Sequence, residues 1–284
     1  MNRRAEEIAI VTDSTCDIPP ELVEEYGITV VPLYILWGDD QLVDGVDIDT
    51  ATFYARLPND PNHPSTSQPT PADFERALGK LQAQDVVVIT LTKELSGTFA
   101  SACQAQKQAG QRCHVVDSRS LSMGLGQQVL AAARAREQGA DVEGIIAAAE
   151  RVRQKSSVLL TVDTLEYLHR GGRIGAAAKF LGSVVQLKPL LEVSHDTGVL
   201  EPVERVRTRK RALSRLVEET FERVDPNKPT RVAIVHSTAE EDAVAVRQEI
   251  EKMCEPLEVI MSAITPVLGV HGGPGVVALC AYNE

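Results

Sequence analysis

Short runs of Val and Ile alternate with helical patterns through the first half of the chain. The run DVVVITL covers residues 85–91, and residues 8–12 and 113–116 form shorter runs of the same kind. Uninterrupted apolar runs of this length are typical of parallel strands that are buried on both faces. Because helical patterns separate the runs, the sequence predicts a three-layer α/β/α domain built on a parallel sheet.

The other elements expected in this half follow from caps and spacing. Residues 29–37 are rich in β-formers and run to a turn at 38–40 and a second arm at 41–43. Asp49 is placed to cap a helix over 50–57, and Asp141 to cap another. Further helices are expected at 20–26, from residue 71 to about 81, at 97–109 and at 122–137.

The second half has a different pattern. Two β-rich segments, 187–193 and 199–206, flank the turn HDTG and predict an antiparallel hairpin. Strands are also expected at 158–162, 232–236, 257–264 and 275–282, with helices at 165–169, 209–224 and 239–253. This mixture predicts a two-layer α/β domain with a mixed sheet. The expected domains are residues 1–156 and 157–284.

Composition narrows the possible ligands. A net charge of −11 over 284 residues repels nucleic acid and anionic headgroups unless a basic patch intervenes. Aromatic residues make up only 4%, so few rings are available for stacking on bases. No apolar run approaches the roughly 18 residues that span a bilayer, so no transmembrane segment is expected and membrane contact would be transient.

Cysteine usage and the first residues indicate a cytoplasmic protein. The opening MNRRAEEIAIVTD places acids before a short apolar run, which is not the pattern of a secretory signal. The cysteines are odd in number and never spaced C-x-x-C, which favours a reducing compartment and argues against a zinc site. They are Cys16, Cys103, Cys113, Cys254 and Cys280. No metal or other cofactor is expected.

The stretch STSQPTP at 65–71 carries more hydroxyls than a helix start needs. Thr70, with proline next and Asp73 three residues on, has the pattern of an N-cap. The remaining hydroxyls form either a polar loop or part of a ligand site. They belong to Ser65, Thr66 and Ser67.

Two further stretches combine glycine with a polar side chain. In LSGTF, residues 95–99, Ser96 either caps the following helix or faces an anion at the helix N-terminus. In LGVHGGPG, residues 268–275, glycines surround His271 between two expected strands. This stretch is either a tight turn with a solvated imidazole or a place where the imidazole hydrogen-bonds a carboxylate.

Two arginine-rich stretches suit anionic ligands or partners. In HRGGRIG, residues 169–175, Arg170 and Arg173 flank a glycine pair, and they are either ordinary surface arginines or anion ligands. Residues 204–216, ERVRTRKRALSRL, hold six basic residues. This basic strip is either a docking patch or a solvated strand edge and helix face.

Catalytic alternatives stay open at this point. The sequence holds no G-x-S-x-G elbow, P-loop or G-x-G-x-x-G. A stand-alone hydrolase would use Ser96 and His271, although no third triad member is visible. A phosphotransferase would use Asp13 in DSTCD. A scaffolding protein without a ligand is the remaining alternative.

Taken in order, these motifs resemble the DegV family. They are IVTDST, STSQPT, LSGTF, VDS, RGGRI and LGVHGGPG, and they span nearly the whole chain. The resemblance implies an α/β fold in two domains and a lipid-binding carrier, not an enzyme. Some members are the fatty-acid-binding subunit of bacterial fatty acid kinase, in which a separate ATP-binding subunit phosphorylates the bound carboxylate.

The resemblance also implies which residues bind. The carboxylate would lie between the domains, with the acyl chain in the C-terminal one. Thr66 and Ser96 would hydrogen-bond the carboxylate, with Ser67 assisting and His271 nearby. Arg173 and Arg170 would lie at the pocket mouth or the partner surface. One position departs from the family, which often has Ser after RI where this chain has Gly175.

The acyl chain and the carboxylate of a fatty acid contribute differently to binding. A C16 chain such as palmitate buries about 14 methylenes, worth about 11 kcal/mol gross at roughly 0.8 kcal/mol each. Hydroxyl hydrogen bonds at about 1 kcal/mol net orient the head instead. The apolar candidates for the pocket wall are Leu159, Leu160, Phe180, Leu190, Ile260 and Ile264.

Overall fold

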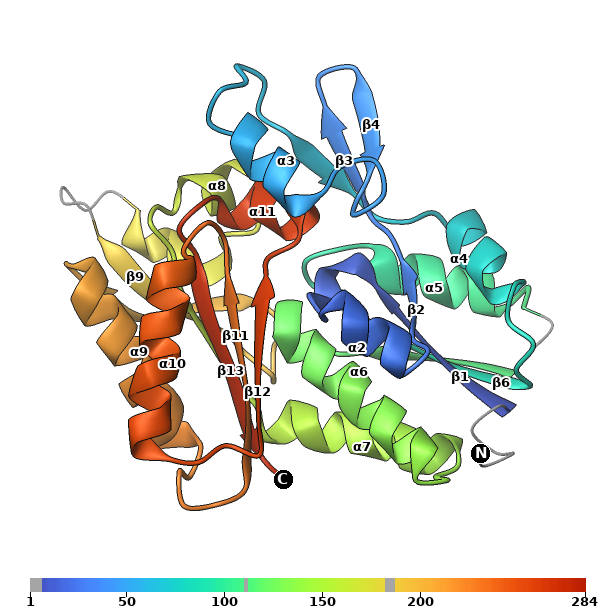
Figure 1. Cartoon of the computed structure of the whole chain (residues 1–284). Coiled ribbons are helices and arrows are strands. Elements are labelled where there is room, and N and C mark those ends of the chain that lie inside the picture. Colours follow the sequence, from blue (N-terminus) through green and yellow to red (C-terminus); the bar gives the residue numbers. More distant parts are fainter. Residues whose placement is uncertain (1–6, 110–111, 182–186) are drawn as a thin grey trace.

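The computed structural model describes residues 7–109, 112–181 and 187–284. The start of the chain, discussed above for its lack of a secretory pattern, falls partly in residues 1–6, which lie outside the described residues. Two large sheets lie side by side, and a small third sheet stands over the gap between them (Figure 1).

The first sheet is parallel, as its apolar runs predict. Its strand order is β2-β1-β6-β7, with β1 Ile8–Asp13, β2 Thr29–Val31, β6 Asp85–Thr90 and β7 Arg112–Asp117. Every residue of β6 is buried, because helices cover both faces of the sheet. Those helices are α2 Pro20–Glu25, α4 Pro71–Leu78, α5 Thr98–Gln106, α6 Ser122–Glu137 and α7 Val142–Lys155. The three-layer prediction is confirmed.

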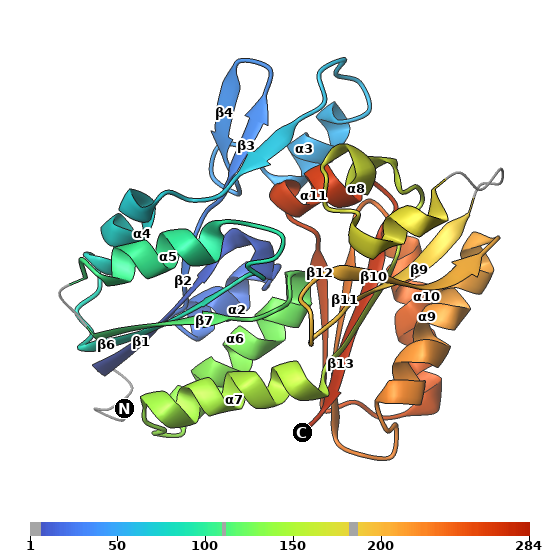
Figure 2. The ribbon, with the colours of Figure 1, turned by 180° about the vertical axis from the view of Figure 1, so that it is seen from behind.

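The second sheet is mixed, and it also matches its prediction. Its order is β10-β9-β8-β13-β11-β12, and only the β11–β12 pair is parallel. The strands are β8 Ser157–Thr161, β9 Lys188–Val193, β10 Leu200–Val206, β11 Thr230–His236, β12 Glu258–Ala263 and β13 Val277–Asn283. Helices α9 Arg209–Arg223 and α10 Glu240–Met253 cover its outer face (Figure 2).

One prediction for the first half is wrong. Residues 29–37 do not form one β-segment, because the chain leaves the parallel sheet at Pro32, which has no N–H for a ladder. The second part becomes β3 Tyr34–Trp37, which pairs with β4 Asp40–Val43 and β5 Ser65–Ser67 in an antiparallel sheet. Helix α3 Thr50–Arg56 packs beneath it, capped by Asp49 as predicted.

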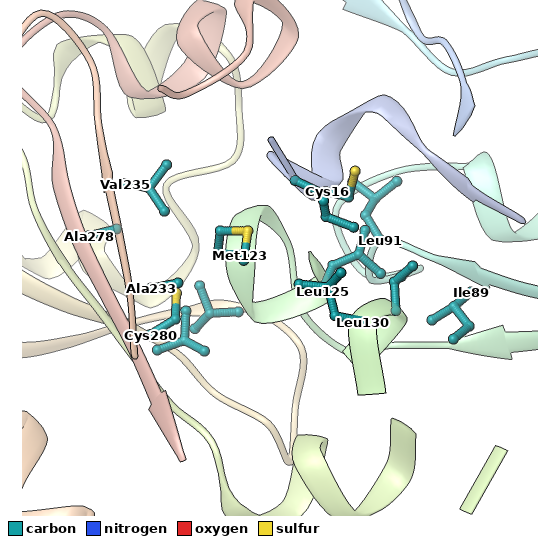
Figure 3. Packing of buried hydrophobic residues seen from close by; sticks show 14 of the residues in the cluster. Cys16, Ile89, Leu91, Met123, Leu125, Leu130, Ala233, Val235, Ala278 and Cys280 are labelled. Carbon is teal, nitrogen blue, oxygen red and sulfur yellow. The ribbon is translucent and has the colours of Figure 1, made fainter. Parts of the chain in front are cut away.

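Helices α6 and α7 form a layer between the two large sheets. One hydrophobic cluster includes Ile89 of the parallel sheet, Leu125 and Leu130 of α6, and Ala233 and Cys280 of the mixed sheet. Figure 3 shows Leu125 and Leu130 lying toward the parallel sheet, and Met123 toward the mixed one. Helix α7 ends at Lys155, and β8, which joins the mixed sheet, begins at Ser157; a domain boundary between residues 156 and 157 stays a prediction.

Shortening a side chain in this shared layer tests whether both halves unfold together. Leu130 is fully buried, so Leu130→Ala is expected to lower the free energy of unfolding by about 2–5 kcal/mol in a single urea transition. Leu257→Ala makes the same truncation at a side chain that is 55% exposed, and it should change stability by less than about 0.5 kcal/mol. Circular dichroism monitors the urea titration, and two separated transitions would contradict a shared core.

Candidate ligand-binding site

A cavity of about 970 Å³, including open space at its mouth, lies between the two halves of the chain. Three of its walls come from segments that follow β1, β6 and β7, at the carboxyl ends where parallel sheets bind ligands. Its apolar lining is Leu33, Leu91, Leu95, Leu121, Val158, Leu160, Leu168, Val193, Leu200, Ile264, Val267, Leu268, Val276 and Ala278.

Polar residues of four chain segments meet at one place on this wall. Thr66 Oγ1 of β5 lies 2.8 Å from Nε2 of His271. The Nε of Arg173 donates to the carbonyl of Leu95, 3.2 Å away and next in sequence to Ser96. Gln68 packs closely enough that a Cβ on Gly97 would lie 2.7 Å from its Nε2. Thr66, Gln68, Ser96, Arg173 and His271 all line the cavity, and together they are called the head cluster.

The strand geometry of β5 separates its hydroxyls. Neighbouring side chains on a strand point to opposite faces, so when Thr66 faces the cavity, Ser65 and Ser67 face away. Neither serine lines the cavity, and the Ser67 hydroxyl donates to the carbonyl of Gln68, 3.3 Å away. Thr70 forms a capping box with Asp73, so its hydroxyl belongs to the start of α4, as predicted.

Ser96 does not occupy the N-cap position. The N-cap of α5 is Gly97, and Ser96 Oγ lies 2.9 Å from Oγ1 of Thr98 while accepting the Thr98 N–H at 3.3 Å. Ser96 therefore steadies the first turn of α5 from one residue earlier, and its half-buried hydroxyl also reaches the cavity.

His271 lies on a helix, and the prediction of a glycine turn is wrong here. Residues 266–272 form α11 Pro266–Gly272, which begins with a proline at N1. The glycine-rich character appears only at its end, where Gly273 and Gly275 have positive φ. Burial, followed by the charges of Arg173 and His63, lowers the pKa of His271 from 6.5 to about 4. The imidazole is therefore neutral at pH 7.

Arg173 supplies the positive charge of the head cluster. Its guanidinium donates to the carbonyls of Leu95 and Gly171, and no carboxylate pairs with it among the residues that the structure describes. Arg170 differs, because it forms an ion pair with Glu166 on α8 Glu166–Arg170 and does not line the cavity. The arrangement is suited to an anion that meets one guanidinium, two hydroxyls and a neutral imidazole.

The two catalytic alternatives find no support in these contacts. The carboxylate of Asp13 is fully buried, with one oxygen bonded to Thr15 and the other to the N–H of Leu91. Ser96 and His271 hydrogen-bond to different partners, not to each other. Across residues 7–109, 112–181 and 187–284, no group of three His, Cys, Asp or Glu side chains is placed to bind a metal.

The basic strip at 204–216 is largely neutralised by its own neighbours. Arg209 pairs with Asp163 and Asp242, and Arg215 pairs with Glu204 and further acids of α9. Arg205 stacks on the ring of Phe180, 4.8 Å from its centroid. This pattern is that of a paired strand edge and helix face.

The apolar candidates divide between wall and core. Leu160 and Ile264 line the cavity, as expected. Leu159 and Leu190 instead pack under α9 and α10, because alternation on a strand sends them to the other face, and Phe180 and Ile260 belong to the core between the sheets. The sequence analysis does not include Leu33, Leu91 and Leu121, which also line the cavity, because it places the acyl chain only in the C-terminal half.

Comparison with known proteins identifies the family to which the chain belongs. The chain matches the family described as "Uncharacterised protein, DegV family" over residues 7–284, so it belongs to the DegV family. A DegV domain-containing protein of Streptomyces coelicolor is 37% identical over 282 residues, which cover 98% of this chain and 99% of that protein. The resemblance inferred from the motifs is confirmed.

Solved structures of similar fold carry a description of their ligand. One, described as showing fatty acid binding of a DegV family protein from Thermus thermophilus, has a TM-score of 0.92 and 33% identity, covering 98% of this chain and all of that one. Another is DegV of Bacillus subtilis, a fatty acid binding protein, with a TM-score of 0.88, 32% identity and coverage of 98% and 99%. None of the described helices in this chain has the length and apolarity that crossing a bilayer requires.

The backbone conformation explains why position 175 is a glycine in this chain. Its φ is +53°, in the left-handed region that disfavours side chains. A Cβ there would also lie 2.8 Å from the carbonyl oxygen of Leu200 on β10. In this chain the position therefore serves close packing of the segment Gly175–Phe180 on β10.

Gly171 gives a test of the placement of His271. A Cβ on Gly171 would lie 2.1 Å from Nδ1 of His271, so Gly171→Ala is expected to displace the imidazole and break its bond to Thr66. Gly79→Ala is a matched control, because both glycines are helix C-caps with similar dihedral angles and both would place Cβ 3.2 Å from one carbonyl. Histidine side-chain NMR should show a shifted His271 signal in the first variant only; an unshifted signal would contradict the packing.

Proposed function

We propose that this protein binds one long-chain fatty acid, with its carboxylate at the head cluster and its acyl chain in the cavity. One observation carries the proposal: polar groups from four distant segments converge on one part of a wall that is mostly apolar. A single anionic end joined to a long apolar body matches that distribution. The fatty acids named for the similar structures are of this class.

The other hydroxyls of the wall support a single orientation of the ligand. Thr15 and Ser122 also line the cavity, but Thr15 donates to Asp13 and Ser122 donates to Asp17. Their protons are therefore already used, and next to buried carboxylates they offer no site for a second anion. The carboxylate is left with the head cluster.

Charge and burial assign separate roles to the two ends of the ligand. A C16 chain contributes about 11 kcal/mol gross, which dominates affinity. The carboxylate loses water on entry and needs replacement partners. Arg173 compensates its charge, while the hydroxyls of Thr66 and Ser96 orient it.

We further propose that the bound carboxylate is presented to an ATP-binding kinase subunit that forms the acyl-phosphate, in the cytoplasm. Two features support this. The sequence holds no nucleotide-binding motif of its own, and the exposed Gln68 beside Gly97 places the head cluster near the surface. Docking through the basic strip loses support, because Arg209, Arg211 and Arg215 pair with acids of the same chain. Arg173 is the better candidate to meet a partner.

Neighbouring hydroxyls on β5 allow a matched test of the head cluster. Thr66→Ala with Ser96→Ala removes two hydrogen bonds to the carboxylate at about 1 kcal/mol each, so palmitate affinity should fall roughly 30-fold. Ser65→Ala with Ser67→Ala removes two hydroxyls from the opposite face and should leave affinity unchanged. Fluorescence titration measures both, and equal affinity for both double variants would sink the assignment.

The carrier role predicts what the isolated protein does not do. Alone with palmitate and ATP, or with an acyl ester, it should form no acyl-phosphate and release no free acid. Adding a bacterial ATP-binding fatty acid kinase subunit should start ATP consumption, and Arg173→Gln should reduce that rate.

Native mass spectrometry of gently purified protein should show a co-purified fatty acid; its absence would favour a scaffolding protein instead.

A further inference from the structure

The start of α11 is bound by two buried carboxylates from the N-terminal half of the chain. The N–H of Thr265 donates to Oδ1 of Asp17 at 2.9 Å, and the N–H of Val267 donates to Oδ1 of Asp44 at 3.3 Å. Pro266 between them has no N–H, and Thr265 makes no side-chain cap. These two bonds therefore satisfy the N–H groups of Thr265 and Val267 at the start of the helix.

The other end of the same helix carries His271. Seven helical residues span about 10 Å, so any tilt or shift at the start of α11 moves the imidazole. The helix is also packed closely on α3, since a Cβ on Gly269 would lie 2.6 Å from both Tyr54 Oη and a ring carbon of Phe53. The placement of His271 beside Thr66 thus depends on how the helix is anchored.

We propose that Asp17 and Asp44 are positioning residues for the head cluster, which hold α11 by its first amides and couple the place of His271 to proton binding. Asp17 is 2% exposed and Asp44 is 3% exposed, and neither pairs with a cation in the described part of the chain. The pair with its two amide bonds is called the α11 latch. Its link to ligand binding rests on the proposed function, but the latch itself does not.

Burial makes these carboxylates sensitive to pH near neutrality. Burial raises the pKa of Asp17 to about 6 and that of Asp44 to about 7. The titratable groups that interact with them are Asp13 at the end of β1, Cys16 in the short turn that follows it, Tyr54 on α3 and Cys280 on β13. None of these carries a positive charge in any protonation state, so charge on the latch is uncompensated.

The hydrogen bonds explain why protonation preserves the latch. Oδ2 of Asp17 bonds to Ser122 Oγ, and Oδ2 of Asp44 bonds to Ser14 Oγ at 2.7 Å. A proton on Oδ2 can be donated to the serine oxygen while Oδ1 still accepts the amide of α11. Deprotonation instead builds repulsion between buried charges. Opening of α11 exposes the carboxylates and returns them to their ordinary pKa, so rising pH favours the open state.

Amide hydrogen exchange in the unliganded protein tests the latch. After correction for base catalysis, the opening constant of the α11 amides is expected to rise roughly 40-fold from pH 5 to 6, because both carboxylates then lose protons on opening, roughly tenfold from pH 6 to 7, and only about twofold from pH 7 to 8. A flat profile would overturn the proposal.

Asn and Ala variants separate positioning from plain structure. Asn retains an acceptor for the amide and a donor for the serine, so Asp17→Asn with Asp44→Asn should stay closed and lose the pH dependence. Asp44→Ala should open α11 at every pH and shift the His271 NMR signal. Asp85→Asn is the control, because Asp85 is a buried carboxylate at the far end of β6, paired with Arg112. A pH dependence that survives in the Asn double variant would contradict the latch.

A palmitate titration on the same variants keeps the two proposals apart. If the wild-type protein binds palmitate, Asp44→Ala should weaken that binding at least about tenfold, while the Asn double variant binds with little dependence on pH. Equal affinity of Asp44→Ala and wild type would overturn the link to the head cluster. A wild-type protein that binds no fatty acid would count against the proposed function, and hydrogen exchange would still decide the latch.

Discussion

The packing of α6 and α7 between two sheets is the contact on which the rest of the structure depends. Two glycines let α6 approach both sides closely: a Cβ on Gly126 would lie 2.6 Å from the carbonyl of Cys16, and one on Gly124 would lie 2.8 Å from a methyl of Val158. Leucines of the same helix fill the side toward the parallel sheet, and Met123 fills the other (Figure 3). Because interiors are close-packed, this layer fixes the distance and angle between the sheets, and the cavity opens where the layer ends.

That geometry explains why the site is built from several chain segments that are distant in sequence. At the carboxyl ends of β1, β6 and β7 the chain must turn, and the loops there face the mixed sheet across the gap. The small antiparallel sheet covers the gap from above and brings Thr66 in, while α11 brings His271 from the opposite half. A ligand bound there contacts both halves at once, so its affinity and the arrangement of the halves are linked.

Much of the fold follows from local patterns. Buried runs such as 85–91 mark the parallel strands, and Asp49 and Thr70 mark helix starts, because capping depends on residues within three positions. The predictions fail where distant residues decide. The stretch around His271 has the composition of a turn, yet it becomes a helix whose first amides are bound by Asp17 and Asp44, more than 200 residues earlier. The candidate site shows the same limit: motif resemblance indicates Thr66, Ser96 and His271, but only strand parity separates Thr66 from Ser67.

By itself, the sequence determined most of the elements and their order, since caps and hydrophobic periodicity are local. Its motifs indicated the family and the residue types able to meet a carboxylate. Tertiary structure alone decided which leucines form a wall and which form a core, and that Arg173 meets no carboxylate in the described part of the chain while Arg209 and Arg215 are neutralised. It also decided that His271 is neutral and that two aspartates hold its helix. These outcomes depend on burial and on partners far away in sequence, and no local pattern encodes either.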